Sequence, residues 1–158
     1  MVGVARGRAP AGQGAARALL GLRILALMLG VFFLVTGAAK FAWFTDSGIL
    51  EERLNRWSNG APASVRWYIE TVATPGIPVF ARLVPLAELA TGAALLAGFW
   101  TRLAAALALF MVLNCHFASG LFHRGWEFLL DAAALPILGG LLALAIGGAR
   151  LPFSVSKS

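Results

Sequence analysis

The chain has 158 residues, of which 59% are hydrophobic and 13% are charged. Soluble domains carry about 25% charged residues, so this composition excludes an ordinary soluble protein and indicates a membrane protein. The net charge of +6 does not indicate a nucleic-acid partner, because the basic residues stand singly at the ends of apolar runs, where they set membrane topology.

The first membrane-spanning helix is predicted at residues 19–41, after a basic tail at 1–18 that is rich in Gly, Ala and Arg and is expected to be flexible. Arg23 and Lys40 lie near opposite ends of this span, about 25 Å apart along a helix, so both are expected to extend toward opposite membrane surfaces. A secretory signal peptide is the competing interpretation. The apolar core is longer than the roughly 7–15 residues of such a peptide, so a retained transmembrane helix is favoured.

A long polar segment at residues 44–76 follows the first span, and it contains two short amphipathic helices. The first is predicted at 47–57, capped by Ser47, and the second at 63–73. The apolar stripe of the second helix is predicted to be Val65, Ile69 and Val72. The aromatic residues near the two helices are Trp43, Trp57, Trp67 and Tyr68. Because such residues concentrate at membrane surfaces, the segment is interpreted as an interfacial cap, with a solvated loop as the alternative.

Three further spans are predicted at residues 79–99, 103–119 and 127–146, and a short tail at 151–158 ends the chain. The domain at 19–150 is therefore expected to be all-α, an integral membrane four-helix antiparallel bundle with short interfacial helices in its first loop. The distribution of Lys and Arg places both termini in the cytoplasm, because the opposite side carries acidic residues among its basic ones.

Close helix contacts are expected where small residues recur along the spans, since small residues let helix backbones approach in a membrane. These residues are Gly30, Gly37, Ala90, Ala94, Gly98, Ala104, Ala108, Gly140 and Gly147. Pro85 and Pro136 are predicted to kink the second and fourth spans, because proline removes a hydrogen bond from the helix.

Glu88 is the most informative residue, because it lies near the centre of the second span. A carboxylate at that depth costs about 2.5–3.5 kcal/mol on insertion scales. It is tolerated when it is paired, protonated or facing a polar cavity. Glu88 therefore predicts a bundle with a polar interior.

Most other polar residues of the spans fall in one half of the predicted bundle and would form an outward-facing funnel above Glu88. The candidate catalytic residues are Glu88, Lys40 and His116. The candidate cofactor-binding residues are Glu127, Asp131 and Asn114. A carboxylate and a histidine can serve as acid and base toward a quinone headgroup or in a proton relay.

A structural interpretation of the same residues stays open. In it, Lys40 pairs with Asp131 or with Glu88, and these ion pairs hold the bundle together. Arg82 would pair with Glu127 in the same way.

No metal site is predicted. His116 and His123 lie too close together in the chain for the facing helices that hold a haem, and with Glu127 they do not have a recognised zinc or iron spacing. Cys115 is the only cysteine, so the chain alone cannot form the disulfide that a thiol–quinone oxidoreductase passes on.

The sequence RILALMLGVFFLVTGAAKF from Arg23, then ELATGAALLAGFWTRLAAAL from Glu88, and a histidine late in the third span form a distinctive pattern. Over residues 22 to 150 this pattern resembles the DoxX family. The matching positions are Arg23, Gly30, Gly37, Lys40, Glu88, Gly92, Gly98, Thr101 and Arg102, and more loosely His116 and Glu127. The resemblance implies a four-helix protein of the bacterial or archaeal cytoplasmic membrane. Relatives include the membrane subunit of a thiosulfate:quinone oxidoreductase.

The expected function is a small accessory subunit of a quinone-linked redox complex in the bacterial inner membrane, with the lipid bilayer and other membrane subunits as partners. The longer first loop departs from the family and is a candidate docking surface. The alternative is a catalytic subunit that binds quinone or relays protons through Glu88, Lys40 and His116, with quinone as the candidate cofactor. A small-solute transporter ranks third, because four helices without a repeat make a poor alternating-access machine.

Overall fold

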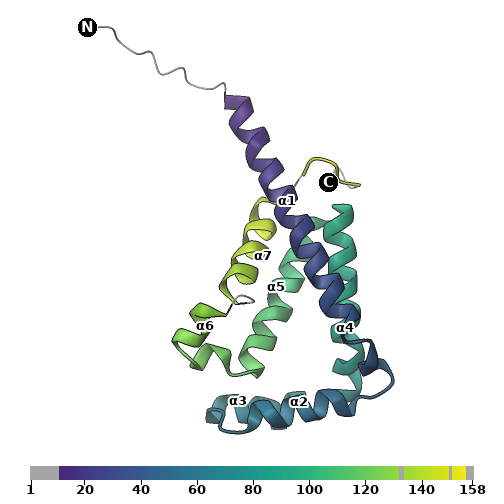
Figure 1. Cartoon of the computed structure of the whole chain (residues 1–158), viewed down its shortest axis with the longest axis vertical. Helices are drawn as coiled ribbons and strands as arrows, with labels where there is room; N and C mark the ends of the chain where they lie inside the picture. Colours follow the sequence, from purple (N-terminus) through teal and green to yellow (C-terminus); the bar gives the residue numbers. More distant parts are fainter. Residues whose placement is uncertain (1–10, 132–133, 150, 156–158) are drawn as a thin grey trace, which may run out of the picture.

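The structure is a computed structural model that describes residues 11–131, 134–149 and 151–155. Within these ranges every regular element is a helix (Figure 1). The helices that are long and apolar enough to cross a membrane are α1 (Ala11–Ala38), α4 (Ile77–Ala97) and α5 (Thr101–Ala118). The predicted all-helical class and three of the predicted spans are therefore confirmed.

The ends of these helices differ from the predicted ends by a few residues. α1 already begins at Ala11, so the predicted limit of the flexible tail at residue 18 falls inside this helix. Residues 1–10 lie outside the described part of the chain. α4 ends at Gly98, whose φ of 68° is the left-handed conformation that commonly terminates a helix.

The fourth predicted span, at 127–146, is interrupted. α6 (Trp126–Leu130) ends at Asp131, whose backbone is extended, and α7 (Leu135–Gly147) begins a few residues later. Pro136 lies in the first turn of α7, where proline is tolerated because its missing N–H would have no partner there. The predicted kink within one continuous helix is wrong, and a break between two helices takes its place.

α1 packs very closely along α4, and glycines make this approach possible. A Cβ added at Gly92 would lie only 2.8 Å from the carbonyl oxygen of Gly30. Gly37 likewise meets a leucine of α4, while Gly140 and Gly147 of α7 face leucines of α1. The predicted small-residue contacts are confirmed at these positions.

Gly92→Ala is expected to lower the free energy of unfolding by about 2 kcal/mol, because the added methyl group meets backbone atoms of α1. Gly139→Ala is the matched control, since no atom lies within 4 Å of a Cβ at that position of α7. The measurement is SDS-induced unfolding of the purified protein in mixed micelles. Equal stability of the two variants would contradict the close packing of α1 on α4.

A cap of short helices closes one end of the molecule (Figure 1). It consists of α2 (Gly48–Ser58), α3 (Ala63–Tyr68) and the π-helical turn η2 (Ile69–Ala73). The amide of Thr74 donates to the carbonyl of Ile69, and this wider turn rotates the helix. As a consequence Ala73 is buried and Val72 is exposed. The predicted apolar stripe of this helix was therefore wrong at Val72.

The cap has an apolar core of its own, made of Trp43, Leu50, Leu54, Val65, Ile69, Ala73, Ile77 and Ala81. Trp43 is 6% exposed, so it packs inside this core and not at the predicted membrane surface. Ser47 makes no capping bond. Instead, Oδ1 of Asp46 accepts the backbone N–H of Gly48 at the start of α2.

Arg23 is 6% exposed, so its side chain is buried within the protein and does not extend outward as predicted. Its guanidinium donates to the carbonyls of Leu95 at 2.9 Å, Leu96 at 2.6 Å and Phe153 at 3.3 Å. The first two belong to the last turn of α4, where helix carbonyls lack an intrahelical partner. Arg23 therefore joins α1, the end of α4 and the C-terminal segment 151–155.

Candidate functional site

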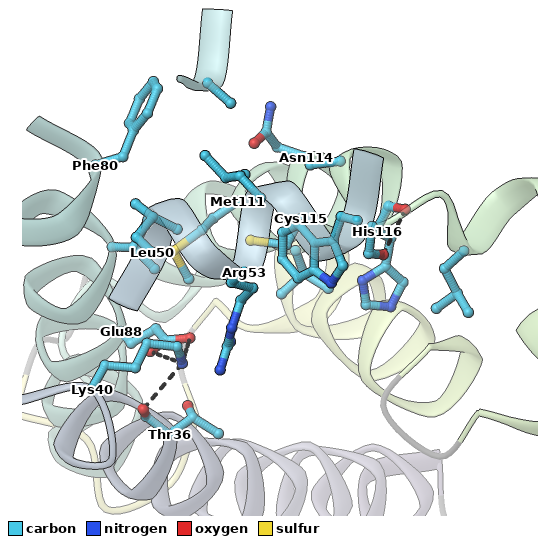
Figure 2. Close-up of a pocket in the computed structure, with 18 of the residues that line it drawn as sticks. Thr36, Lys40, Leu50, Arg53, Phe80, Glu88, Met111, Asn114, Cys115 and His116 are labelled. Carbon is cyan, nitrogen blue, oxygen red and sulfur yellow. Dashed lines mark hydrogen bonds and ion pairs between the residues drawn. The ribbon is translucent and has the colours of Figure 1, made fainter. Parts of the chain in front are cut away.

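A cavity of about 410 Å³ lies between α1, α4 and α5, beneath the helices of the cap (Figure 2). Its polar lining residues are Thr36, Lys40, Arg53, Tyr68, Glu88, Asn114, Cys115, His116, Ser119 and Asp131. Much of the remaining wall is aromatic or aliphatic, with Phe33, Val84 and Met111 among its members. Small-molecule sites have volumes of about 300–1,000 Å³ and combine apolar walls with a few polar groups. The cavity has both properties.

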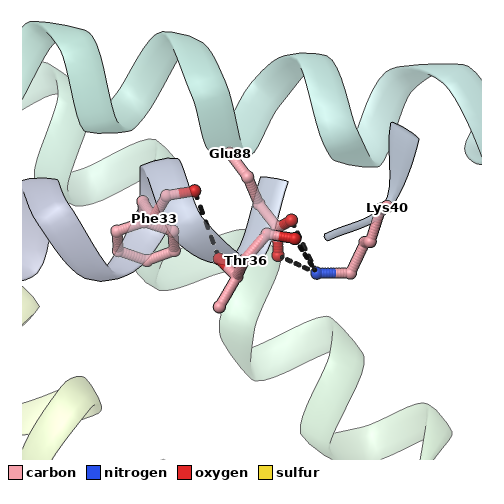
Figure 3. A network of polar contacts seen from close by, with 4 residues as sticks. All are labelled: Phe33, Thr36, Lys40 and Glu88. Carbon is pink, nitrogen blue, oxygen red and sulfur yellow. Dashed lines mark hydrogen bonds and ion pairs between the residues drawn. The ribbon is translucent and has the colours of Figure 1, made fainter. Parts of the chain in front are cut away.

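Lys40 and Glu88 form an ion pair in the wall of this cavity (Figure 3). Nζ of Lys40 donates to Oε2 of Glu88 at 2.6 Å and to Oε1 at 2.8 Å. It also donates to the carbonyl oxygen of Thr36 at 3.1 Å, in the last turn of α1. The two side chains are 16% and 12% exposed. Glu88 therefore has a partner and faces a cavity at the same time.

The hydrogen-bonding capacity of the pair is used unequally. The ammonium group of Lys40 has three donors, and its three bonds use all of them. Among the described residues, the carboxylate of Glu88 accepts bonds only from Lys40, although a carboxylate has about four acceptor sites. Glu88 can therefore accept a further bond from a molecule in the cavity.

Arg53 brings a second cation to the cavity from α2, and the sequence analysis missed it. Its guanidinium lies 5.1 Å from the ring centre of Trp43 and 6.0 Å from that of Trp57. The signal in the sequence was its position, because Arg53 lies with Leu50, Leu54 and Trp57 on the apolar stripe of α2. A basic residue on such a stripe points toward the interior and not toward solvent.

His116 contributes a free hydrogen-bonding atom. Its Nε2 is buried and makes no hydrogen bond within the described residues, although buried polar atoms are normally satisfied. The ring centre lies 6.0 Å from that of Phe122. His116 lines the cavity, and the hydrogen-bonding capacity of its Nε2 is not used by any described residue.

Asn114 links α5 to the cap. Its Nδ2 donates to the hydroxyl oxygen of Tyr68 at 2.7 Å. Both residues line the cavity, and Asn114 is exposed. This bond holds α3 against α5 at the rim of the cavity.

Asp131 lines the cavity as expected, but Glu127 does not. Glu127 is exposed on α6, where an oxygen of its carboxylate lies 3.5 Å from Arg124. Arg82 donates to the carbonyl of Pro78 in its own helix, so the predicted pair of Arg82 with Glu127 does not form. The expectation failed because Asp131 lies beyond the end of α6, so the two acids do not share one helical face.

The donors of the cavity suit an organic ligand better than a metal ion. In the described part of the chain, no group of three or more His, Cys, Asp and Glu residues gathers as metal ligands would. Histidine, lysine and carboxylate groups at the edge of an apolar cavity are instead suited to bind a polar head with a hydrophobic body.

The chain was compared with known proteins. A family model described as DoxX matches residues 18–124, which is more than half of the chain. No curated protein and no solved structure matches the chain.

Proposed function

The chain belongs to the DoxX family, and from this premise we propose that it is a small membrane subunit of a quinone-linked redox complex that holds a quinone headgroup in its cavity. The observation that carries the proposal is that the Lys40–Glu88 pair and His116, whose Nε2 is unbonded among the described residues, line the same cavity. A quinone has carbonyl oxygens that need hydrogen-bond donors and a ring that needs an apolar wall.

The proposed placement in the membrane is a four-helix antiparallel arrangement in the bacterial inner membrane. α1, α4 and α5 would cross the bilayer, α6 and α7 together would supply the fourth passage, and the cap would lie at the outer surface. Exposed Trp67 in the cap supports this position, since tryptophan concentrates at membrane surfaces. The start of α1 and the C-terminal segment lie at the opposite end, which supports cytoplasmic termini (Figure 1).

The residues of the cavity fit a quinone. When bound, a quinone supplies the capacity to carry electrons and protons between redox proteins. His116 would orient a carbonyl oxygen through Nε2, and the Lys40–Glu88 pair would exchange protons with the bound head. Phe33, Val84 and Met111 would exclude water around the ring.

His116→Phe is expected to weaken quinone binding about tenfold without lowering the stability of the empty protein. The stability is unchanged because Nε2 has no bond to lose within the described residues, and phenylalanine keeps the ring contact with Phe122. Binding of a short-chain quinone to the full chain is measured by quenching of tryptophan fluorescence, because Trp43 and Trp57 line the cavity.

His123→Phe is the matched control, since His123 lies in the short turn η3 (Leu121–His123) and does not line the cavity. This variant should bind quinone as the wild type does. A wild-type protein that binds no quinone in neutral detergent would overturn the proposed site.

The second candidate is a purely accessory subunit, and the full use of the three Lys40 donors within the protein favours it. In that case the pair would only hold α1 to α4. Purification in mild detergent separates the two candidates. An accessory subunit elutes with a larger complex but without bound quinone, whereas a quinone-binding subunit retains the quinone.

A further inference from the structure

The charges in the cavity are unevenly satisfied. Lys40 and Glu88 form an ion pair, with 2.6 Å between Nζ and Oε2. Asp131 also has an interaction partner. Arg53, in contrast, makes no hydrogen bond or ion pair with any residue in the ranges that the structure describes. A charge that is partly removed from water is costly unless a counter-charge satisfies it. The N–H donors of Arg53 therefore have no acceptor within the described residues.

Two indole rings fix the position of this guanidinium. The guanidinium of Arg53 lies over the rings of Trp43 and Trp57, and its side chain extends into the space beside Lys40 and Glu88 (Figure 2). Cation–π contacts engage the positive charge but occupy none of the five N–H donors of a guanidinium. The donors therefore stay free for a ligand.

The chemistry of the guanidinium restricts which ligand fits. Its donors form a rigid planar fork that matches the two oxygens of a planar anion, whereas a lysine would act only as a point charge. The rest of the wall, with Phe33, Val84 and Met111, requires an apolar body behind the charged end.

We infer that the cavity selects molecules whose polar end is a planar oxyanion bound by Arg53 and whose body is apolar. The inference rests on the proposed function for the cavity being a ligand site, and it adds the charge of the ligand. Among quinones, it selects rings with an ionised hydroxyl group next to a carbonyl, because the fork can bind the two adjacent oxygens together.

The test compares two ligands of similar shape and different charge. 2-Hydroxy-1,4-naphthoquinone is an anion at neutral pH, and 2-methoxy-1,4-naphthoquinone is neutral. Fluorescence quenching of the full chain in neutral detergent should show about tenfold tighter binding of the anion. Arg53→Gln should abolish this preference by lowering the affinity for the anion to that for the neutral compound.

Two further variants separate recognition from folding. Arg56→Gln is the matched control, because Arg56 is an exposed residue of α2 that pairs with Glu52, and it should keep the full preference. Arg53→Lys retains the positive charge but lacks the planar fork of N–H donors. It should therefore keep only part of the preference for the anion. Its thermal unfolding midpoint should match that of the wild type.

The outcomes distinguish the inference from the proposed function. Equal binding of the two naphthoquinones by the wild type, or an unchanged preference in Arg53→Gln, overturns the inference and leaves the quinone site standing. Binding of dodecanoate but of neither naphthoquinone supports an oxyanion site and overturns the proposed function. Binding of none of the three compounds overturns both.

Discussion

Lys40→Met should lower the free energy of unfolding by about 3 kcal/mol. The change removes the donor on which the carboxylate of Glu88 depends among the described residues, and it leaves that carboxylate in a site where the side chain is 12% exposed. The carbonyl of Thr36 loses the same donor. SDS-induced unfolding in mixed micelles measures the effect.

The double variant Lys40→Met/Glu88→Leu should recover most of the lost stability, because apolar replacement of both partners of a buried pair is often neutral or stabilising. Arg82→Met is the control, since this exposed arginine donates only to a carbonyl of its own helix. A double variant as unstable as the sum of its single changes would show that the two residues do not act as a pair.

Arg23→Met should also cost about 3 kcal/mol, and it should release the C-terminal segment. The carbonyls of Leu95, Leu96 and Phe153 would lose a charged donor inside the protein. Leu151, which is 5% exposed, would lose the anchor that holds its segment against α1. Unfolding in SDS gives the stability, and cleavage by carboxypeptidase gives the release of the segment.

Arg17→Met is the control for this second change, because Arg17 is an exposed residue of the same helix. It should unfold like the wild type and resist carboxypeptidase equally well. If Arg23→Met behaves in the same way as Arg17→Met, the buried guanidinium does not stabilise the fold.

The long helices were predictable because an apolar run that is long enough to cross a bilayer has few alternatives to a transmembrane helix. The glycine contacts were predictable for a related reason, since small residues at regular spacing have a defined use between helices in lipid. The break at Asp131 was not, because only Glu127 and Asp131 interrupt the apolar run at 126–146, and Pro136 is compatible with a kink, a start or a break.

The lining of the cavity was predicted in part. His116 and Lys40 were expected to face the interior because polar residues inside spans are rare. Arg53 was missed because it lies in a loop between spans, where arginine usually sets topology. Only the fold of the cap over the end of the bundle turns this residue toward the cavity.

Several residues that resemble the family make contacts between helices in this chain. Arg23 donates to a carbonyl in the last turn of α4. Gly30 and Gly92 permit the close approach of α1 and α4. Lys40 forms an ion pair with Glu88. Arg53 is not among the matching positions. Family membership therefore supports the architecture. The class of ligand follows instead from the residues that line the cavity of this chain.

The shortness of α7 has a consequence for the proposed fourth passage, which α6 and α7 would supply together. Its 13 residues extend about 20 Å, whereas the hydrocarbon core of a bilayer is about 30 Å thick. Either α6 supplies the remaining length, or the bilayer thins beside α7. Higher stability in vesicles of short-chain lipids would show such thinning, and equal stability in short-chain and long-chain vesicles would show that α6 completes the passage.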